Sequence, residues 1–176
     1  MKKSGKMTFA ALLCIIVCIA AAVLYMFLEP AGEETSGEEL SLKSSSYGQI
    51  LLSVDCGVLE DNPLVPEKLI GSGIIPEDYS FAEKTAVELT EGDTAFSVLE
   101  RFCRSEGIAL DCQYGPSGVY IRGIGGLSEF DCGALSGWMV RVNGVFPSES
   151  SGSVLLSDGD EVEFLYTCDI GADLSE

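Results

Sequence analysis

The chain has 176 residues with 10 basic and 28 acidic side chains, a formal charge of -18, and no histidine. That length accommodates one domain of ordinary size with appendages. The acidic balance argues against a nucleic-acid-binding protein, because neutralising phosphates requires clustered Lys and Arg. The lack of histidine excludes catalytic sites with a histidine base and metal sites with imidazole ligands. Composition therefore disfavours most classes of enzyme.

Residues 8–28, TFAALLCIIVCIAAAVLYMFL, form an apolar segment without a charged side chain. A helix of this length, at ~1.5 Å per residue, spans roughly 30 Å, the thickness of a hydrocarbon core. We expect residues 1–28 to be a single-pass membrane anchor. A cleaved signal peptide is the alternative, but the apolar run is long for one and no Ala-x-Ala site follows promptly. Lysines before the segment and acids after it predict a cytoplasmic N-terminus and an extracellular domain at the cell membrane.

Residues 29–46 are rich in Glu, Ser and Gly and show no apolar periodicity. Such a composition cannot bury enough surface to fold, so we expect a flexible linker there. The globular domain is expected at residues 47–172. Residues 29–176 together carry a net charge of -21, which favours solubility and disfavours contact with anionic lipid.

Alternating apolar residues predict a first strand over residues 50–56 and a second over residues 85–89. The prolines and glycines between them, at 57–83, are typical of a long ordered loop. One amphipathic helix is expected at 94–106, with Asp93 or Thr94 as its N-cap. Further strands are expected at 108–112, 119–124, 138–142 and 161–168, with turns at 143–144 and 157–160. This order predicts an α+β fold in which a mainly antiparallel sheet packs on one helix.

Three segments carry a resemblance to a known family: VELTEGDTAFSVLERF (87–102), YIRGIGGLSEFDCGALSGWMVRVNGVFP (120–147) and LSDGDEVEFLYTCDIG (156–171). They resemble the transcobalamin-like C-terminal domain family, which is widespread in surface proteins of Gram-positive bacteria. The strand ILLSVDC (50–56) fits the first element of that family. The resemblance implies a β-grasp domain, similar to the smaller domain that caps cobalamin in transcobalamin and intrinsic factor.

The same resemblance implies an extracellular, membrane-tethered binding module that captures cobalamin or a related soluble ligand. Because those carriers sandwich the corrinoid against a larger helical domain, a helical partner protein or a membrane importer is an implied partner. No resident cofactor is implied beyond such a ligand. A non-catalytic surface module for adhesion or interaction is the alternative function. Nothing in the sequence pairs a nucleophile with a base, so we do not expect an enzyme.

A ligand platform would need aromatic rings with backbone polar groups beside them. The alternation of Trp138 with Val140, and of Tyr166 with Phe164, favours a core position for both aromatic residues. Tyr120 has the opposite parity from its apolar neighbours and is the freer candidate. Asn143 lies in an Asn-Gly pair, which is most often only a hairpin turn. The candidate ligand-binding residues are Tyr120, Ser136, Gly137, Trp138, Asn143, Phe146 and Tyr166.

Five cysteines follow residue 28, an odd number: Cys56, Cys103, Cys112, Cys132 and Cys168. The resemblance favours a disulfide between Cys56 and Cys168, because the first and last strands of a β-grasp sheet are neighbours. Cys132 is the rival partner for either. Cys103 is expected to be a small buried hydrophobe on the helix, and no histidine is present to activate a catalytic thiol. The acids at 158–163 lack the ligand spacing of a calcium loop, so no metal site is expected.

Overall fold

The computed structural model describes residues 47–63 and 65–174. We refer to residues 47–174 as the head. The expected anchor at 1–28 and linker at 29–46 lie outside the described residues. Among the residues that the structure does describe, there is no helix with the length and apolar character needed to cross a bilayer.

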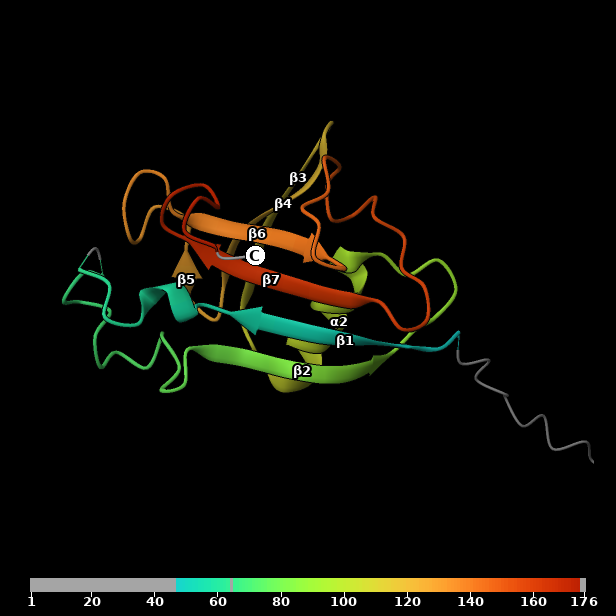
Figure 1. Ribbon diagram of the computed structural model, residues 1–176, viewed down its shortest axis with the longest axis horizontal. Coiled ribbons are helices and arrows are strands. Elements are labelled where there is room, and N and C mark those ends of the chain that lie inside the picture. Colours follow the sequence, from blue (N-terminus) through green and yellow to red (C-terminus); the bar gives the residue numbers. More distant parts are fainter. Residues whose placement is uncertain (1–46, 64, 175–176) are drawn as a thin grey trace, which may run out of the picture. The chain divides into compact units, whose positions relative to one another are not determined.

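The head is an α+β structure with two sheets and one α-helix (Figure 1). A four-stranded sheet has the order β2-β1-β7-β6, and a three-stranded antiparallel sheet has the order β3-β4-β5. In the larger sheet, β1 and β7 are parallel while both outer pairs are antiparallel. The elements are β1 Gln49–Asp55, η1 Gly57–Leu59, β2 Ser80–Glu88, α2 Ala95–Glu106, β3 Leu110–Gly115, β4 Gly118–Ile124, β5 Leu127–Ser128, β6 Gly137–Val142 and β7 Glu161–Thr167.

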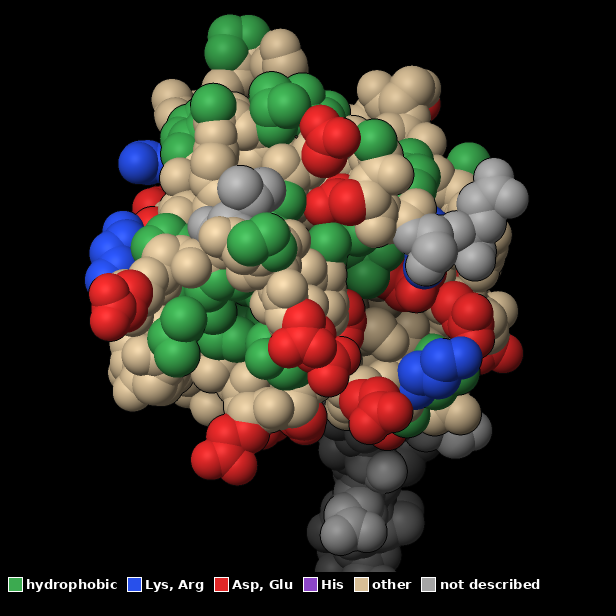
Figure 2. Space-filling model, turned by 60° about the vertical axis from the view of Figure 1, so that its left-hand side comes forward, with side chains coloured by type: hydrophobic (Ala, Val, Ile, Leu, Met, Phe, Trp, Pro, Cys, Tyr) green, Lys and Arg blue, Asp and Glu red, His purple; other side chains and the backbone are tan. Residues whose placement is uncertain are grey.

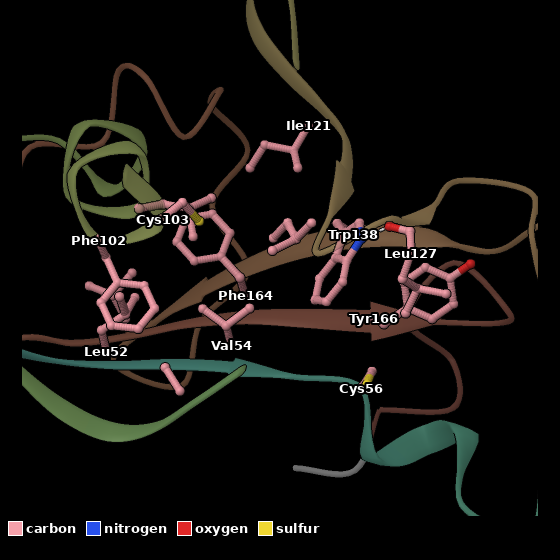
Figure 3. Close-up of a cluster of buried hydrophobic side chains, with 14 of the residues drawn as sticks. Leu52, Val54, Cys56, Phe102, Cys103, Ile121, Leu127, Trp138, Phe164 and Tyr166 are labelled. Atoms are coloured by element: carbon pink, nitrogen blue, oxygen red, sulfur yellow. Dashed lines mark hydrogen bonds between the residues drawn. The ribbon is translucent and has the colours of Figure 1, made fainter. Parts of the chain in front are cut away.

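The hydrophobic core lies between the larger sheet and α2 (Figure 3). Alternate side chains of β1 and β7 point into it, as the sequence alternation predicts, and Leu52, Val54 and Phe164 have no exposed surface. From the helix, Phe102 and Cys103 reach the same core. This burial of one sheet face and one helix stripe is what holds the two layers together.

The helix begins where the sequence predicts, because its first turn is capped by side chains. Thr94 accepts a hydrogen bond from the backbone N–H of Ser97, while the Ser97 hydroxyl accepts one from the backbone N–H of Thr94. This reciprocal capping satisfies two of the donors that a helix N-terminus leaves unpaired. The helix ends at Glu106, and Gly107 forms a left-handed C-cap with φ +70° whose backbone N–H donates to the Cys103 carbonyl.

A buried carboxylate ties the helix to the loop before it. Asp93 accepts from the backbone and hydroxyl of Thr90, from the Ser97 hydroxyl, and from both terminal nitrogens of Arg101 at 3.0 and 2.7 Å. Burial by itself raises the pKa of this carboxyl. The hydrogen bonds from Arg101, Thr90 and Ser97 outweigh burial and hold the pKa well below its usual range.

Two strands differ from the prediction by more than one residue at an end, and one strand was missed. β2 begins at Ser80, so the expectation of an irregular loop through residue 83 is wrong for its last four residues. The reason is a bulge: Leu52 pairs with Thr85 but Val54 pairs with Ala82, and one of the two β2 residues between those pairs, Lys84, has φ +41°. A bulge shifts the two-residue alternation, which hides the start of the strand from a periodicity search. β3 spans residues 110–115 rather than 108–112, and the two-residue strand β5 was not predicted.

Candidate binding site

Three loops meet at one end of the head, on the left of Figure 1. They comprise residues 56–63 with 65–79, residues 129–136, and residues 168–174. The contacts that join them are a Lys68–Asp131 ion pair at 3.1 Å and a hydrogen bond from the Ile170 backbone N–H to the Leu135 carbonyl at 3.2 Å. We call this region the loop end.

The first loop of the loop end folds around a hollow of about 490 Å³. That volume lies within the range of roughly 300–1,000 Å³ that is usual for small-molecule sites, which are mostly apolar with a few polar groups. The apolar part of the lining comes from Leu59, Val65, Leu69, Ile70, Ile75, Pro76 and Tyr79, and the polar part from Asp61, Asn62 and Glu77. The loop end therefore contains a hollow with the lining expected of a ligand site.

Large apolar side chains are exposed beside the hollow. Phe130, Leu135 and Ile170 are 63%, 48% and 66% exposed. Figure 2, in which this end of the molecule is turned forward, shows hydrophobic side chains interspersed with acidic ones and few basic ones. Such side chains are normally placed in the core, so a group of them at one end marks a surface suited to apolar contact.

The backbone of the loop end is strained. Within 47–63 and 65–174, six non-glycine residues have positive φ, and four of them are at this end: Asp61, Tyr79, Phe130 and Ile170. A left-handed conformation costs an L-residue roughly 1–2 kcal/mol. It persists only where the surrounding structure fixes it, and such residues gather at binding and catalytic sites. The strain thus coincides with the hollow and the exposed apolar residues.

The loop end rests on a layer of buried aromatic residues (Figure 3). The Trp138 indole N–H donates to the Leu127 carbonyl at 2.9 Å. The Tyr166 hydroxyl donates to the Ser128 carbonyl at 2.7 Å and lies 3.1 Å from the Ser136 hydroxyl oxygen. Burial raises the pKa of Tyr166 above its ordinary value, so this hydroxyl stays a neutral donor at physiological pH. Trp138, Tyr166 and Ser136 are all buried and support the loops from below.

The other candidate residues are dispersed over the head. Gly137, next to Ser136, begins β6 at the base of the loop end. Tyr120 is half-exposed on β4, and its hydroxyl donates to Glu129 at 2.6 Å, a hydrogen bond that raises the pKa of Tyr120. It lines a separate hollow beside the β3–β4 turn, to which Trp138 does not contribute.

Asn143 and Phe146 lie at the far end of β6, away from the loop end. The Asn143 side chain donates to Asp160 at 2.8 Å and accepts from the backbone N–H of Glu161. With φ +50° it forms the tight turn that an Asn-Gly pair predicts. The Phe146 ring packs under the Arg141 guanidinium, 5.8 Å from the ring centre. Asn143 and Phe146, which the sequence analysis gave as candidate ligand-binding residues, therefore have structural partners within the head.

A larger hollow of about 590 Å³ lies on the face of the four-stranded sheet opposite the core. Its floor carries the Arg141–Glu163 ion pair, whose two hydrogen bonds measure 2.7 and 2.8 Å. At its rim, Asp173 accepts hydrogen bonds from the Thr167 hydroxyl and from the Cys168 backbone. Arg141, Glu163 and Asp173 thus already have hydrogen-bond partners within the head.

The cysteines correct one expectation. In the described part of the chain all five are free thiols, so the favoured Cys56–Cys168 disulfide is not formed. The strand register gives the reason. Asp55 pairs with Leu165 in the parallel β1–β7 ladder, so Cys56 is level with Tyr166, and Cys168 lies two residues, roughly 6.6 Å, further along. Cys103 is buried on the helix as predicted, and burial raises its pKa to about 11. Over the same described residues, no group of three or more Cys, Asp or Glu has the arrangement of a metal site.

The hollow of the loop end was missed by the sequence analysis. Its signal was present in the segment 65–79, which contains Leu69, Ile70, Ile74 and Ile75 among prolines and glycines. Apolar residues that follow neither a helical nor a strand period, inside a loop too long to be a simple connection, favour a functional loop with its own small core.

Comparison with known proteins gives a match to a family model and matches to solved structures, among them the two that follow. No curated protein matches the chain. The crystal structure of haptocorrin in complex with Cbi is similar at 18% identity and a TM-score of 0.49, covering 68% of this chain and 25% of the haptocorrin chain. A crystal structure described as that of a "putative metal binding protein" from Ruminococcus gnavus ATCC 29149 is similar at 18% identity and a TM-score of 0.41, covering 68% of this chain and 96% of that one. The chain thus spans a quarter of the length of haptocorrin. Residues 92–167, which run through α2 to the end of β7, match the family described as "Domain of unknown function (DUF4430)".

Proposed function

We propose that the head is a non-catalytic module that captures a soluble ligand at the loop end, outside the cell, while residues 1–28 tether it to the membrane. The observation that carries this proposal is the apolar hollow of about 490 Å³ beside the exposed Phe130, Leu135 and Ile170. The cost of holding Phe130 and Ile170 in left-handed conformations supports a role for them beyond packing.

The ligand class rests on the sequence resemblance, and a corrinoid is the first to test. The parallel central pair of strands and the single helix on one sheet face support a β-grasp domain of the transcobalamin-like type. A corrinoid presents an apolar ring edge together with peripheral amide groups. The loop end offers apolar side chains for contact with the ring edge. It also offers Asp61 and Glu77 as hydrogen-bond acceptors for the amide N–H groups.

The charge of the head favours one corrinoid over another. Residues 29–176 carry a net charge of -21, and Lys68, the one Lys or Arg among the described residues of the loop end, is paired with Asp131. Cobalamin contains a phosphodiester that cobinamide lacks. The phosphodiester makes cobalamin one charge more negative than cobinamide, and an anionic surface disfavours that added charge. Cobinamide should therefore bind at least as tightly as cyanocobalamin, and the difference should shrink as salt is added.

Equilibrium dialysis of the full-length chain in detergent against cyanocobalamin and cobinamide tests the proposal, since the absorbance of the corrin measures bound ligand directly. Ile70→Asp and Ile170→Asp change exposed residues of the loop end and should each weaken binding at least tenfold. Leu155→Asp is the matched control, because Leu155 is 70% exposed, like Ile70 at 67%, but pairs with Thr94 beside the helix start. Absence of saturable binding at high micromolar corrinoid, or equal binding by all three variants, would contradict capture at this site.

A surface-interaction module is the second candidate. It is favoured by Phe130 and Ile170, which are exposed but do not line the hollow. A photo-reactive residue at position 130, in cells, should then yield a protein adduct that the same residue at position 155 does not. This experiment also detects a helical partner or importer that completes the site in trans. Protease added to intact cells should degrade the head if it is extracellular.

A further inference from the structure

Three buried thiols converge beneath the loop end. Cys56 directly follows β1, Cys168 directly follows β7, and Cys132 lies in the loop 129–136. Cys56 and Cys132 have no exposed surface, and Cys168 is 7% exposed. Three cysteines drawn from three separate loops are more than the small hydrophobic core of this region requires.

Hydrogen bonds fix Cys132 and Cys168 next to each other. The backbone N–H of Cys132 donates to the Ser136 hydroxyl oxygen at 3.1 Å, and that oxygen lies 3.1 Å from the Tyr166 hydroxyl, two residues before Cys168. The Ile170–Leu135 backbone hydrogen bond joins the two loops again on the other side of the cysteines. The two thiols are close enough for each to influence the pKa of the other.

Cys56 belongs to the same cluster, since its pKa responds to Cys132, but its thiol has a partner of its own. Its thiol donates to the Tyr79 carbonyl at 3.1 Å, which directs it toward the first loop. The Cys168 sulfur instead accepts from the Asn62 side chain at 3.7 Å. With the strand register also separating Cys56 from Cys168, Cys132 and Cys168 are the two sulfurs that need the least movement to bond.

We propose that Cys132 and Cys168 are a redox pair, which a small or protein disulfide converts to an intramolecular disulfide that joins the loops 129–136 and 168–174. In the first step the Cys168 thiolate, the more exposed of the two, attacks a sulfur of the oxidant and releases one thiolate. The Cys132 thiolate then attacks the Cys168 sulfur of the mixed disulfide and releases the second. Two cysteine thiols lose two protons and two electrons, and the oxidant gains them as two thiols.

The same burial that brings the thiols together makes them slow to react once the head has folded. Burial raises the pKa of Cys168 to about 11 and that of Cys56 to about 12, and it raises the pKa of Cys132 as well. Since the thiolate is the attacking species, oxidation of the folded head should accelerate roughly tenfold per pH unit between pH 7 and pH 10. At neutral pH the bond should form fastest during folding in an oxidising compartment.

A disulfide between Cys132 and Cys168 would make the proposed site more rigid, and this consequence rests on the proposed function. Phe130, Leu135 and Ile170 are all within five residues of Cys132 or Cys168. A covalent link between the two loops removes conformations in which these side chains are apart. Ligand binding would then cost less ordering entropy in the oxidised head than in the reduced one.

Peptide mapping tests the pair without any ligand, because the sequence separates all the relevant cysteines. Trypsin cleaves after Lys43, Lys68, Arg122 and Arg141, so Cys56, Cys132 and Cys168 fall on three different peptides. The full-length chain in detergent is oxidised with glutathione disulfide, both folded at pH 9 and during refolding at pH 8. Free thiols are then alkylated, and the digest is analysed by mass spectrometry. We expect a linked pair of the peptides 123–141 and 142–176.

Three Cys→Ser variants test which cysteines form the link. Cys132→Ser and Cys168→Ser should each abolish the link, whereas Cys56→Ser, equally buried at the same end, should keep it. Oxidation should raise the melting temperature of the wild type by roughly 10 °C, as expected for a closed loop of this length, and should not change that of Cys132→Ser. Full alkylation of both cysteines under both conditions, or a dominant link through Cys56, would overturn the proposal. A confirmed link without corrinoid binding would contradict only the proposed function.

Discussion

Replacing the buried carboxylate before the helix tests whether its charge, rather than its shape, stabilises the head. Asp93 is 6% exposed and accepts five hydrogen bonds from three residues, two of them from Arg101. Asp93→Asn keeps the volume and one oxygen, but it removes the charge and turns the other acceptor into a donor. The variant should unfold more easily at pH 7.

The size of the effect follows from these contacts. A hydrogen bond to a charged group contributes about 1 kcal/mol more than a neutral one, so the two bonds from Arg101 account for about 2 kcal/mol. In the variant, the new amide N–H also faces one of the existing donors, and this unsatisfied contact lowers stability by about 1 kcal/mol more. Because the Arg101 side chain is 38% exposed, water can solvate its charge after the change. The loss of stability should therefore stay below the largest losses that follow when a fully buried ion pair is broken. We expect a decrease of about 3 kcal/mol in the free energy of unfolding.

The pH dependence separates charge from shape. The folded-state pKa of Asp93 lies below the value of about 3.9 expected in the unfolded chain, so its contribution to stability is complete above about pH 5. That contribution is lost as the pH falls below 4 toward the folded-state pKa. Asparagine does not titrate, so the difference between wild type and variant should be constant from pH 7 to pH 5 and should shrink by pH 3.

Urea unfolding at pH 7 and pH 3, followed by the fluorescence of Trp138, measures this difference. Trp138 is the single tryptophan of the chain and is buried, so its emission reports on the core. Glu149→Gln is the control: it makes the same change in net charge at an exposed position and should leave stability within about 0.5 kcal/mol of wild type. An equal loss for Asp93→Asn at both pH values would refute the role assigned to the charge.

Two further changes test the backbone. Gly125→Ala should destabilise by about 3 kcal/mol or more in urea unfolding, because the new methyl group would overlap the Phe81 ring. Gly159→Ala, with a similarly positive φ but open space around it, should cost only about 1 kcal/mol, and equal losses would exclude the clash as the cause. Ile170→Asn should stabilise the head by about 1 kcal/mol, because asparagine tolerates φ +49° better than isoleucine does. The same change should weaken corrinoid binding. A loss of stability would mean that Ile170 is not strained.

The elements that the sequence predicted well are those whose signals are local. The signals for the helix at 94–106 are an N-cap, an apolar stripe and a C-terminal glycine, and all of them lie in the helix or directly beside it. The parity of Trp138 and Tyr166 likewise indicated their core positions, as the burial of both residues confirms. By contrast, the start of β2 depends on how Leu52 and Val54 pair across the sheet, which no pattern within 80–84 records.

The candidate binding site was harder to predict for the same reason. Its hollow is formed by a loop without a regular period, held in place by Lys68 against Asp131 and by Asn62 against Cys168. Those partners are more than sixty residues apart in the sequence. The sequence analysis instead chose aromatic residues near turns, and the turn residue Asn143 proved to be paired with Asp160. Long-range contacts decide which loop encloses a cavity, whereas composition shows only that a loop is unusual.

The parallel pairing of β1 with β7 bears on when the head can fold. Leu51 pairs with Glu161, about 110 residues later, and both strands occupy the middle of the sheet. The core therefore cannot close while β7 is still inside the ribosome or a translocation channel. Contacts of such high sequence separation also make folding slow. In the proposed location outside the cell the head would benefit from that delay, because an exported chain must stay unfolded while it is threaded across.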